Sequence, residues 1–330
     1  MRKKLLSVVS MALVVGLLGG CASTKPATPA QTDTASGQKT YKVAYIARAQ
    51  SDSFAAWLAN SVKEEAKKYP NMKLEVFDGQ ANDDKENSMI ENAITNKFDL
   101  VIVQPNSGES QRPYVEKVVK AGIFAITTNA RISGIEGASS VDAQPYEQAA
   151  VNARAALKQI PQNAKVVVLK GPSGNFHADE RRKSWQKEFF DKRPDVKIVG
   201  EQIANWNKDE AMKYMEDWVQ ANDKIDAVIS MNDNMAAGAL EVVKGNPKFA
   251  NILAYGVDGT AEALLLIKDG RMTSTCLQNA NELAEKMLDA SNKLLTGKEK
   301  VINTDIGNPL VTKENVDQYI EILKKSGSIK

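Results

Sequence analysis

Residues 225–244 read IDAVISMNDNMAAGALEVVK. An apolar run in this stretch stops at three polar residues, Asn232-Asp233-Asn234, and a helical pattern rich in small residues follows. This order is typical of a buried strand that passes into a helix in an α/β protein. The polar triplet stands at the end of the predicted strand, so it either caps the helix or belongs to a binding site.

The same alternation runs through the chain from Tyr41 onward. Repeated βαβ order predicts parallel sheets covered by helices on both faces. Two sheets with a break near Val141-Asp142 fit usual domain sizes better than one large sheet, so we expect two α/β lobes. Strands are predicted over 41–47, 73–78, 100–104, 124–128, 165–170, 197–204, 227–230, 252–257 and 274–278, and helices include 54–68, 83–97, 112–121, 145–160, 280–296 and 316–325.

The N-terminus has the pattern of an export signal. Basic residues precede a short apolar stretch, 5–18, which falls short of the about 20 residues of a membrane span. We therefore expect residues 1–20 to be a signal peptide. The end of this stretch, LGGC, resembles the lipobox of bacterial lipoproteins, which implies that Cys21 carries lipid; the alternative is an ordinary cleavage site with a chance cysteine. Residues 21–40 contain almost no large apolar side chain and predict a flexible tether.

Composition limits the functional classes. The chain of 330 residues has a net charge of +2 and no basic run interleaved with aromatics, so we expect no nucleic-acid partner. Of its 2 cysteines Cys276 is left alone if Cys21 is lipidated, which predicts no disulfide. The single histidine, His177, excludes most histidine-rich metal sites. We expect no metal and no cofactor.

Polar and aromatic residues follow almost every predicted strand. The carboxyl ends of parallel strands meet at one edge of a sheet, which is where ligands bind in such proteins. Each residue also has a simpler role, as a helix cap, a turn residue or a packing residue. Candidate caps are Asp52, Ser53, Asn207, Asp233 and Asn234; Asp258 is a candidate turn residue; candidate packing residues are Phe54, Trp57, Trp185 and Trp218.

The gathering of these residues favours a site that binds a sugar or polyol. Aromatic faces cover apolar C–H surfaces, and hydroxyls both donate to and accept from amides, carboxylates and arginines. A ligand rich in hydroxyls also offsets the cost of burying Asp and Arg side chains. Such a set favours binding over chemistry.

At these residues the sequence resembles the type I periplasmic sugar-binding proteins, the ribose- and galactose-binding family of ABC importers. The resemblance covers 41–311, and its most specific pieces are NDNMAAGA at 232–239 and GVDGT at 256–260. It implies two doubly wound parallel-sheet lobes joined by a three-strand hinge. It also implies lobe boundaries at 41–141 plus 279–307 and at 142–278 plus 308–330, with hinge crossings near 141–142, 278–279 and 307–308.

The resemblance also implies roles for single residues. Asp258 and Asn232 bind ligand hydroxyls. Arg181 makes paired hydrogen bonds to ring and hydroxyl oxygens, and Gln278 or Asn279 contributes from the hinge.

Two aromatic residues, Phe54 and Trp206, are implied to sandwich the ring. In the first lobe Asp52 stands where the family often has Asn, and Asn129 where a ribose binder has Asp; Arg131 lies one residue late for that binder's arginine. These departures leave the identity of the sugar open.

Three residues are secondary candidates. Asn175 and His177 match a loop that touches the ligand in galactose-type members, although a loop histidine without a ligand role is the alternative. Trp57 lies one helical turn after Phe54.

The expected function is therefore that of a monomeric, membrane-anchored, extracytoplasmic lipoprotein that binds a monosaccharide, polyol or cyclitol and delivers it to an ABC permease. A ligand-presenting partner of a chemoreceptor or sensor kinase, or a binder of a furanose-type autoinducer, fits the same residues. A repressor is disfavoured because a signal and tether replace a helix-turn-helix. A glycosidase would need two flanking carboxylates such as Asp52 and Asp258, but neither has the surroundings of a raised-pKa acid, so we expect no enzyme.

Overall fold

The computed structural model describes residues 39–325 and residue 329. The predicted signal peptide, the lipid on Cys21 and the tether up to residue 38 lie outside the described residues. Within the described part, no helix combines the length and the hydropathy needed to cross a membrane.

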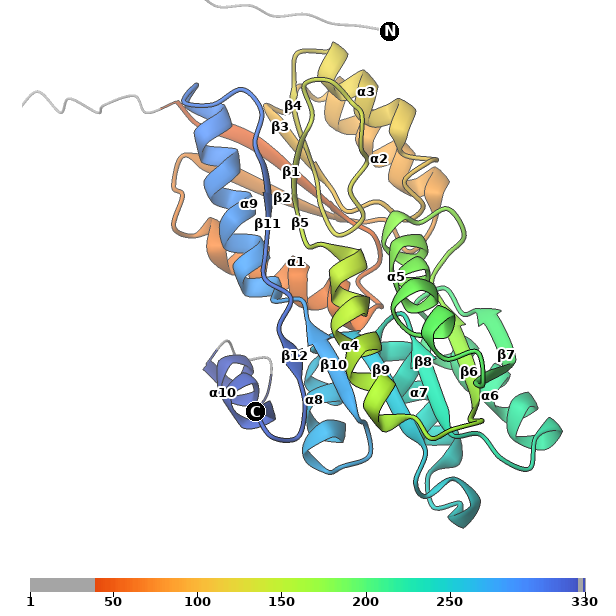
Figure 1. The fold of residues 1–330 in the computed structure, drawn as a ribbon. Coiled ribbons are helices and arrows are strands. Elements are labelled where there is room, and N and C mark those ends of the chain that lie inside the picture. Colours follow the sequence, from red (N-terminus) through yellow and green to blue (C-terminus); the bar gives the residue numbers. More distant parts are fainter. Residues whose placement is uncertain (1–38, 326–328, 330) are drawn as a thin grey trace, which may run out of the picture. The chain divides into compact units, whose positions relative to one another are not determined.

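The first sheet has six strands in the order β11-β5-β4-β3-β1-β2, and every pair in it is parallel. Helices α1 and α9 pack on one face and α2 and α3 on the other (Figure 1). The strands are β1 (Tyr41–Ala47), β2 (Met72–Asp78), β3 (Leu100–Val103), β4 (Phe124–Thr127), β5 (Ser139–Asp142) and β11 (Asn303–Asp305); the helices are α1 (Ser53–Ala66), α2 (Asp83–Thr95), α3 (Arg112–Lys120) and α9 (Ala280–Leu295).

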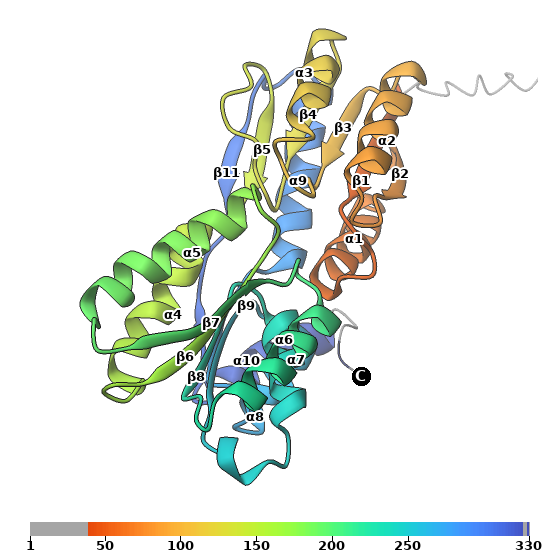
Figure 2. The same cartoon turned by 90° about the vertical axis from the view of Figure 1, so that its right-hand side faces the viewer.

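The second sheet has the order β12-β10-β9-β8-β6-β7, with only the edge strand β12 antiparallel to its neighbour. Helices α4 and α5 cover one face and α6, α7 and α8 the other, while α10 packs on α8 (Figure 2). The strands are β6 (Lys165–Lys170), β7 (Lys197–Ile203), β8 (Ala227–Ser230), β9 (Leu253–Asp258), β10 (Ser274–Leu277) and β12 (Leu310–Val311); the helices are α4 (Pro145–Gln159), α5 (Phe176–Glu188), η1 (Phe190–Lys192), α6 (Lys208–Ala221), α7 (Asp233–Val243), η2 (Pro247–Phe249), α8 (Ala261–Lys268) and α10 (Val316–Lys325).

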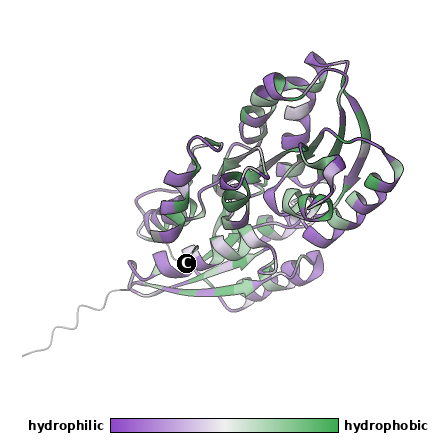
Figure 3. Ribbon diagram, turned by 90° about the horizontal axis from the view of Figure 1, so that it is seen from below, coloured by the Kyte–Doolittle hydropathy of each residue, from purple (hydrophilic) through white to green (hydrophobic). Residues whose placement is uncertain are grey.

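Strand β1 shows why the central strands read as continuous apolar runs. Val43 and Tyr45 point into the core under α1 and α9, whereas Ala44 and Ile46 point into the core under α2 and α3. A strand buried on both faces needs apolar residues at every position. The central strands are accordingly largely apolar, and much of the polar sequence lies on the helices (Figure 3).

Three segments pass between the two sheets. One joins β5 to α4, the second joins β10 to α9, and the third joins β11 to β12. Two doubly wound lobes joined by three crossings confirm the fold expected from the resemblance, that of a type I periplasmic binding protein.

The predicted elements recur with shifts of one or two residues at most ends, but three short strands have no counterpart among them. The strands β5, β11 and β12 read SSVD, NTD and LV, so they lack the apolar run by which a strand is recognised. The sheet partners beside them define them as strands. β5 also carries the first sheet one residue beyond the expected break, since Asp142 pairs with Asp305.

Candidate ligand-binding site

A polar pocket lies where the carboxyl ends of strands from both sheets meet. Its walls come from the ends of β1, β8 and β9, the start of α1, the segment after β4, the start of α5 and the turn after β7. The lining residues are Arg48, Asp52, Phe54, Asn129, Asn175, His177, Arg181, Trp206, Asn232 and Asp258.

Nine residues that the sequence put forward as ligand contacts are thus brought together, and Arg48 joins them. Four others, Trp57, Arg131, Gln278 and Asn279, are not part of this lining. The sequence does carry a signal for Arg48, which is a charged residue directly after an apolar strand.

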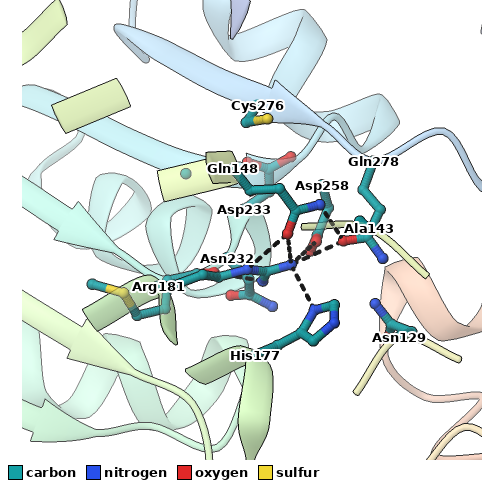
Figure 4. Close-up of polar contacts among 12 residues, drawn as sticks. Asn129, Ala143, Gln148, His177, Arg181, Asn232, Asp233, Asp258, Cys276 and Gln278 are labelled. Carbon is teal, nitrogen blue, oxygen red and sulfur yellow. Dashed lines mark hydrogen bonds and ion pairs between the residues drawn. The ribbon is translucent and has the colours of Figure 1, made fainter. Parts of the chain in front are cut away.

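Arg181 is held from several sides (Figure 4). Its Nε and Nη2 donate to Gln148 Oε1 over 3.2 and 2.8 Å. Nη2 also donates to Gln278 Oε1 over 2.9 Å, and Nη1 donates to the Met231 carbonyl over 2.8 Å. Gln148 in turn donates to Gln278 over 2.7 Å, so the two glutamines form one buried support for the guanidinium.

These bonds bear on the expectation that Arg181 makes paired hydrogen bonds to the ligand. A guanidinium has five N–H donors. Nε faces Gln148, one Nη1 hydrogen faces Met231, and the two Nη2 hydrogens are shared among Gln148, Gln278 and His177 Nδ1, which lies 3.4 Å from Nη2. One Nη1–H of Arg181 is left for the pocket in this arrangement.

Asp258 is the main unused acceptor of the pocket. Its carboxylate is buried and accepts no hydrogen bond from the described residues; the nearest cation is Arg181, with Nη2 3.7 Å from Oδ1. Burial raises the pKa of Asp258 well above its ordinary value, against the lowering influence of Arg181, so the expectation that Asp258 lacks the surroundings of a raised-pKa acid was wrong. Asp258 also has a φ of 126°, a strained value for a residue other than glycine. A buried, strained and unsatisfied acceptor marks a binding position.

The N-cap of α7 is a different residue of the triplet 232–234 from the two that we expected, Asp233 and Asn234. Asn232 is the cap, because its Oδ1 accepts from the Met235 N–H over 3.0 Å. Its Nδ2 remains for the pocket. Asp233 Oδ2 instead accepts from the Thr260 N–H over 2.9 Å, and its Oδ1 from Thr275 Oγ1 over 2.6 Å. Asp233 therefore holds the turn that carries Asp258 next to β10.

Trp206 occupies a strained turn that several neighbours fix. Trp206 and Asn205 have φ values of 62° and 51°. The Trp206 carbonyl accepts from Asn234 Nδ2 over 2.9 Å, and the Arg181 guanidinium lies 5.5 Å from the ring centre. The indole lies so close to Gly171 that a Cβ there would stand 2.2 Å from Cζ2. The absence of a side chain at Gly171 thus leaves the room that the Trp206 indole occupies.

The first lobe supplies an ion pair, an amide and an aromatic face. Arg48 Nη2 lies 3.1 Å from Asp52 Oδ2, and both side chains are buried. Asp52 Oδ1 caps α1, as predicted, by accepting from the Ala55 N–H. Asn129 Oδ1 accepts from Gln104 over 2.8 Å, which leaves the Asn129 Nδ2 for the pocket.

The two aromatic residues of α1, Phe54 and Trp57, have different roles. Phe54 lines the pocket, and Trp57 meets it edge-on with ring centres 6.0 Å apart. Trp57 packs against the apolar cores of both lobes, and its Nε1 donates to Asn281 over 3.3 Å.

The remaining predicted residues support the site from outside its lining. Arg131 pairs with Asp305 and lies 3.7 Å from Asp142, at the ends of the crossing strands. Asn279 caps α9. Gln278 is fully buried, and its Nε2 has no partner among the described residues.

Comparisons with known proteins fit this geometry. The family model described as "Periplasmic binding protein domain" matches residues 43–299. The xylitol-binding protein of Mycolicibacterium smegmatis is 28% identical over 75% of this chain and 71% of its own, and the ribose import binding protein of Bacillus subtilis is 26% identical over 93% and 98%. Among solved structures, the myo-inositol binding protein of Caulobacter with bound myo-inositol has a TM-score of 0.80 at 26% identity, covering 86% of this chain and 97% of that one. A solute binding protein of an ABC transporter from Bacillus halodurans, also with bound myo-inositol, has a TM-score of 0.80 at 25% identity, covering 86% and 98%.

Proposed function

The chain belongs to the periplasmic binding protein family of sugar ABC importers, and on that premise we propose that it captures one monosaccharide, polyol or cyclitol between its lobes. The family is extracytoplasmic, and its members are binding proteins. The relatives are named for binding an alditol, a pentose and a cyclitol, which fits a ligand defined by its hydroxyls.

The observation that carries the proposal is the set of polar groups left without protein partners. Among the described residues, the donors are the Arg48 N–H groups that do not face Asp52, Asn129 Nδ2, Asn232 Nδ2 and one N–H of Arg181; the main acceptor is the Asp258 carboxylate. A hydroxyl donates one hydrogen bond and can accept two, so a ligand with several hydroxyls accepts more bonds than it donates. A pocket rich in donors with one central carboxylate matches that ratio.

The aromatic walls support a ring or a flat carbon chain. Phe54 lines the pocket from the first lobe and Trp206 from the second. Their faces suit the apolar C–H surface of a sugar or cyclitol. In this proposal Asp52, Asn175 and His177 shape the pocket, while Trp57, Arg131, Gln278 and Asn279 hold the residues that touch the ligand.

We propose lobe boundaries at the three crossings. The first lobe comprises 41–142 plus 279–307, and the second comprises 143–278 plus 308–330. The pairing of Asp142 with Asp305 supports the shift of the first boundary by one residue. Closure about these few crossing residues is the hinge motion by which two-lobed proteins enclose a ligand.

Delivery and anchoring complete the proposal. The closed, loaded monomer docks on an ABC permease, and lipid on Cys21 holds it at the membrane. It releases its ligand without chemical change.

A thermal-shift screen of the purified chain lacking residues 1–21 tests the function. Pentoses, hexoses, cyclitols and alditols are compared, since a ligand at 100 times its Kd stabilises the protein by about 2.7 kcal/mol. We expect Asp258→Ala and Trp206→Ala to abolish the shift while the circular dichroism spectrum is kept, and Ser173→Ala, an exposed change near the pocket, to retain it. Either pocket variant binding normally would overturn the assignment of the site. Turnover of the bound sugar would contradict the proposal that the protein is not an enzyme.

A further inference from the structure

The start of α5 touches the first lobe at two points. Asn175 Nδ2 donates to the Asn106 carbonyl over 2.8 Å, in the loop after β3. His177 Nε2 lies 3.0 Å from Asp142 Oδ2, at the end of β5. One turn further, the same helix carries Arg181. A single helix end thus links first-lobe groups to the arginine that faces the pocket.

His177 contacts Asp142 through Nε2 and faces the Arg181 guanidinium with its other ring nitrogen, as Figure 4 shows for the pair His177 and Arg181. Its Nδ1 lies 3.4 Å from Arg181 Nη2. A guanidinium has donors only, so Nδ1 is the acceptor and carries no proton. The proton of the neutral ring therefore sits on Nε2 and is donated to the Asp142 carboxylate.

The surroundings of His177 oppose a second proton. The side chain is 2% exposed, and the cations Arg181 and Arg131 both act on it. Burial lowers the pKa of His177, and the opposing attraction of Asp142 does not restore it. The pKa of Asp142 is itself held below its usual value, because His177, the Ala143 N–H and Arg131 outweigh the effect of burial. Asp305 pairs with Arg131 on the far side, and the pocket that His177 lines also holds the charged groups Arg48, Asp52 and Asp258.

We propose that neutral His177 is a positioning residue, which fixes Arg181 against the pocket and ties it to Asp142 of the first lobe, and that its protonation weakens ligand binding. This inference rests on the proposed function. It assigns His177 a task other than the direct ligand contact that the sequence suggested.

The physical reason lies at Nδ1. A proton there places an N–H opposite the N–H groups of Arg181 and brings two positive charges together across 3.4 Å. The bond to Asp142 survives, because an imidazolium still donates from Nε2. The contact that breaks is the one to Arg181, and repulsion by the imidazolium then shifts the guanidinium against its remaining bonds to Gln148, Gln278 and Met231.

The first test needs no ligand. His177 is the single histidine of the chain, so the untagged protein gives one set of imidazole resonances in an ¹⁵N NMR titration. We expect the Nε2–H tautomer at pH 7.5 and a pKa below the ordinary 6.5. Asp142→Asn should lower that pKa further, since it removes the attraction that favours the imidazolium. An Nδ1–H tautomer, or a pKa at or above 6.5, overturns the proposal whether or not the protein binds sugars.

The second test measures Kd by calorimetry for myo-inositol, xylitol and D-ribose between pH 7.5 and 5.0. For a probe that binds, affinity should fall by up to about tenfold per pH unit below the pKa of His177. His177→Gln keeps a donor for Asp142 but does not titrate at position 177. Its affinity should therefore fall less than that of the wild type, while the raised pKa of Asp258 gives both proteins the same background dependence. Glu180→Gln, on the same helix and paired only with Lys183, should follow the wild type. Equal pH profiles for wild type and His177→Gln refute the positioning role. If none of the three probes binds, the proposed function fails in this range and the NMR titration still decides the state of His177.

Discussion

The replacement Glu86→Gln should stabilise the protein at neutral pH. Glu86 lies in the first turn of α2 and is fully buried. Its Oε2 accepts from the Asn106 N–H over 3.0 Å, whereas Oε1 has no partner among the described residues. Burial raises the pKa of Glu86 from 4.5 to about 8, with Asp83 adding to the rise and the Asn106 N–H and Arg48 opposing it.

The pH dependence of the unfolding free energy, in sign and magnitude, follows from the difference between the pKa of Glu86 in the folded and in the unfolded chain. Between pH 4.5 and 8 the folded protein holds a proton on Glu86 that the unfolded chain has released, so this group's contribution to stability is full below pH 4.5 and falls as the pH rises. Each pKa unit corresponds to about 1.4 kcal/mol, so at pH 7 the loss is on the order of 3 kcal/mol. Glutamine resembles the protonated acid but does not ionise in the unfolded chain, so the variant avoids this loss.

Urea unfolding at pH 4.5, 5.5, 6.5 and 7.5 measures the effect. The gain in unfolding free energy of Glu86→Gln over wild type should be near zero at pH 4.5 and grow to roughly 3 kcal/mol near neutral pH. Asp84→Asn, an exposed carboxylate in the same helical turn, serves as control and should show no comparable growth. A pH-independent difference for Glu86→Gln would mean that Glu86 is ionised in the folded protein, and the reasoning would fail.

Three further outcomes are expected. Gly171→Ala should displace the Trp206 indole, because a Cβ would stand 2.2 Å from it, and abolish ligand-induced thermal shifts at an unchanged fold; retained shifts would contradict the account of the ring. Trp57→Phe should cost about 1 kcal/mol of unfolding free energy through the lost bond to Asn281, which urea unfolding would reveal, whereas an unchanged midpoint would show that the bond contributes nothing. Cys276 should resist a thiol reagent in the folded protein and react on unfolding, since it is fully buried and burial raises the pKa of its thiol; rapid labelling of the native protein would disprove this.

The main strands and helices could be predicted because each is encoded locally. A strand buried on both faces requires an apolar run, and a helix that packs on it requires a periodic apolar stripe. The positions of Asp52, Asn232 and Asp258 followed from the rule that ligands lie beyond the carboxyl ends of parallel strands. The strand β5 could not be read in the same way, because its serines become strand residues only through their partners in β4 and β11.

The residues that hold the pocket side chains in place could not be predicted either, because they come from distant parts of the sequence. Gln148 and Gln278 are 130 residues apart in sequence, and nothing near either residue indicates that they meet around Arg181. The choice of Asn232 over Asp233 as cap likewise depended on Thr260, at the start of α8, and Thr275, in β10, which both donate hydrogen bonds to the Asp233 carboxylate.

The fixed guanidinium of Arg181 has a consequence for how new specificities arise on this scaffold. Its rotamer is set when the chain folds, so binding avoids the cost of about 0.5–1.5 kcal/mol for ordering such a side chain. The same anchoring prevents Arg181 from following a hydroxyl that moves to another carbon. Adaptation to a different ligand therefore falls to the first lobe, where Arg48 and Asn129 still carry donors without protein partners. We expect the Arg181 contact of the second lobe to stay the same from ligand to ligand, and the contacts of the first lobe to vary.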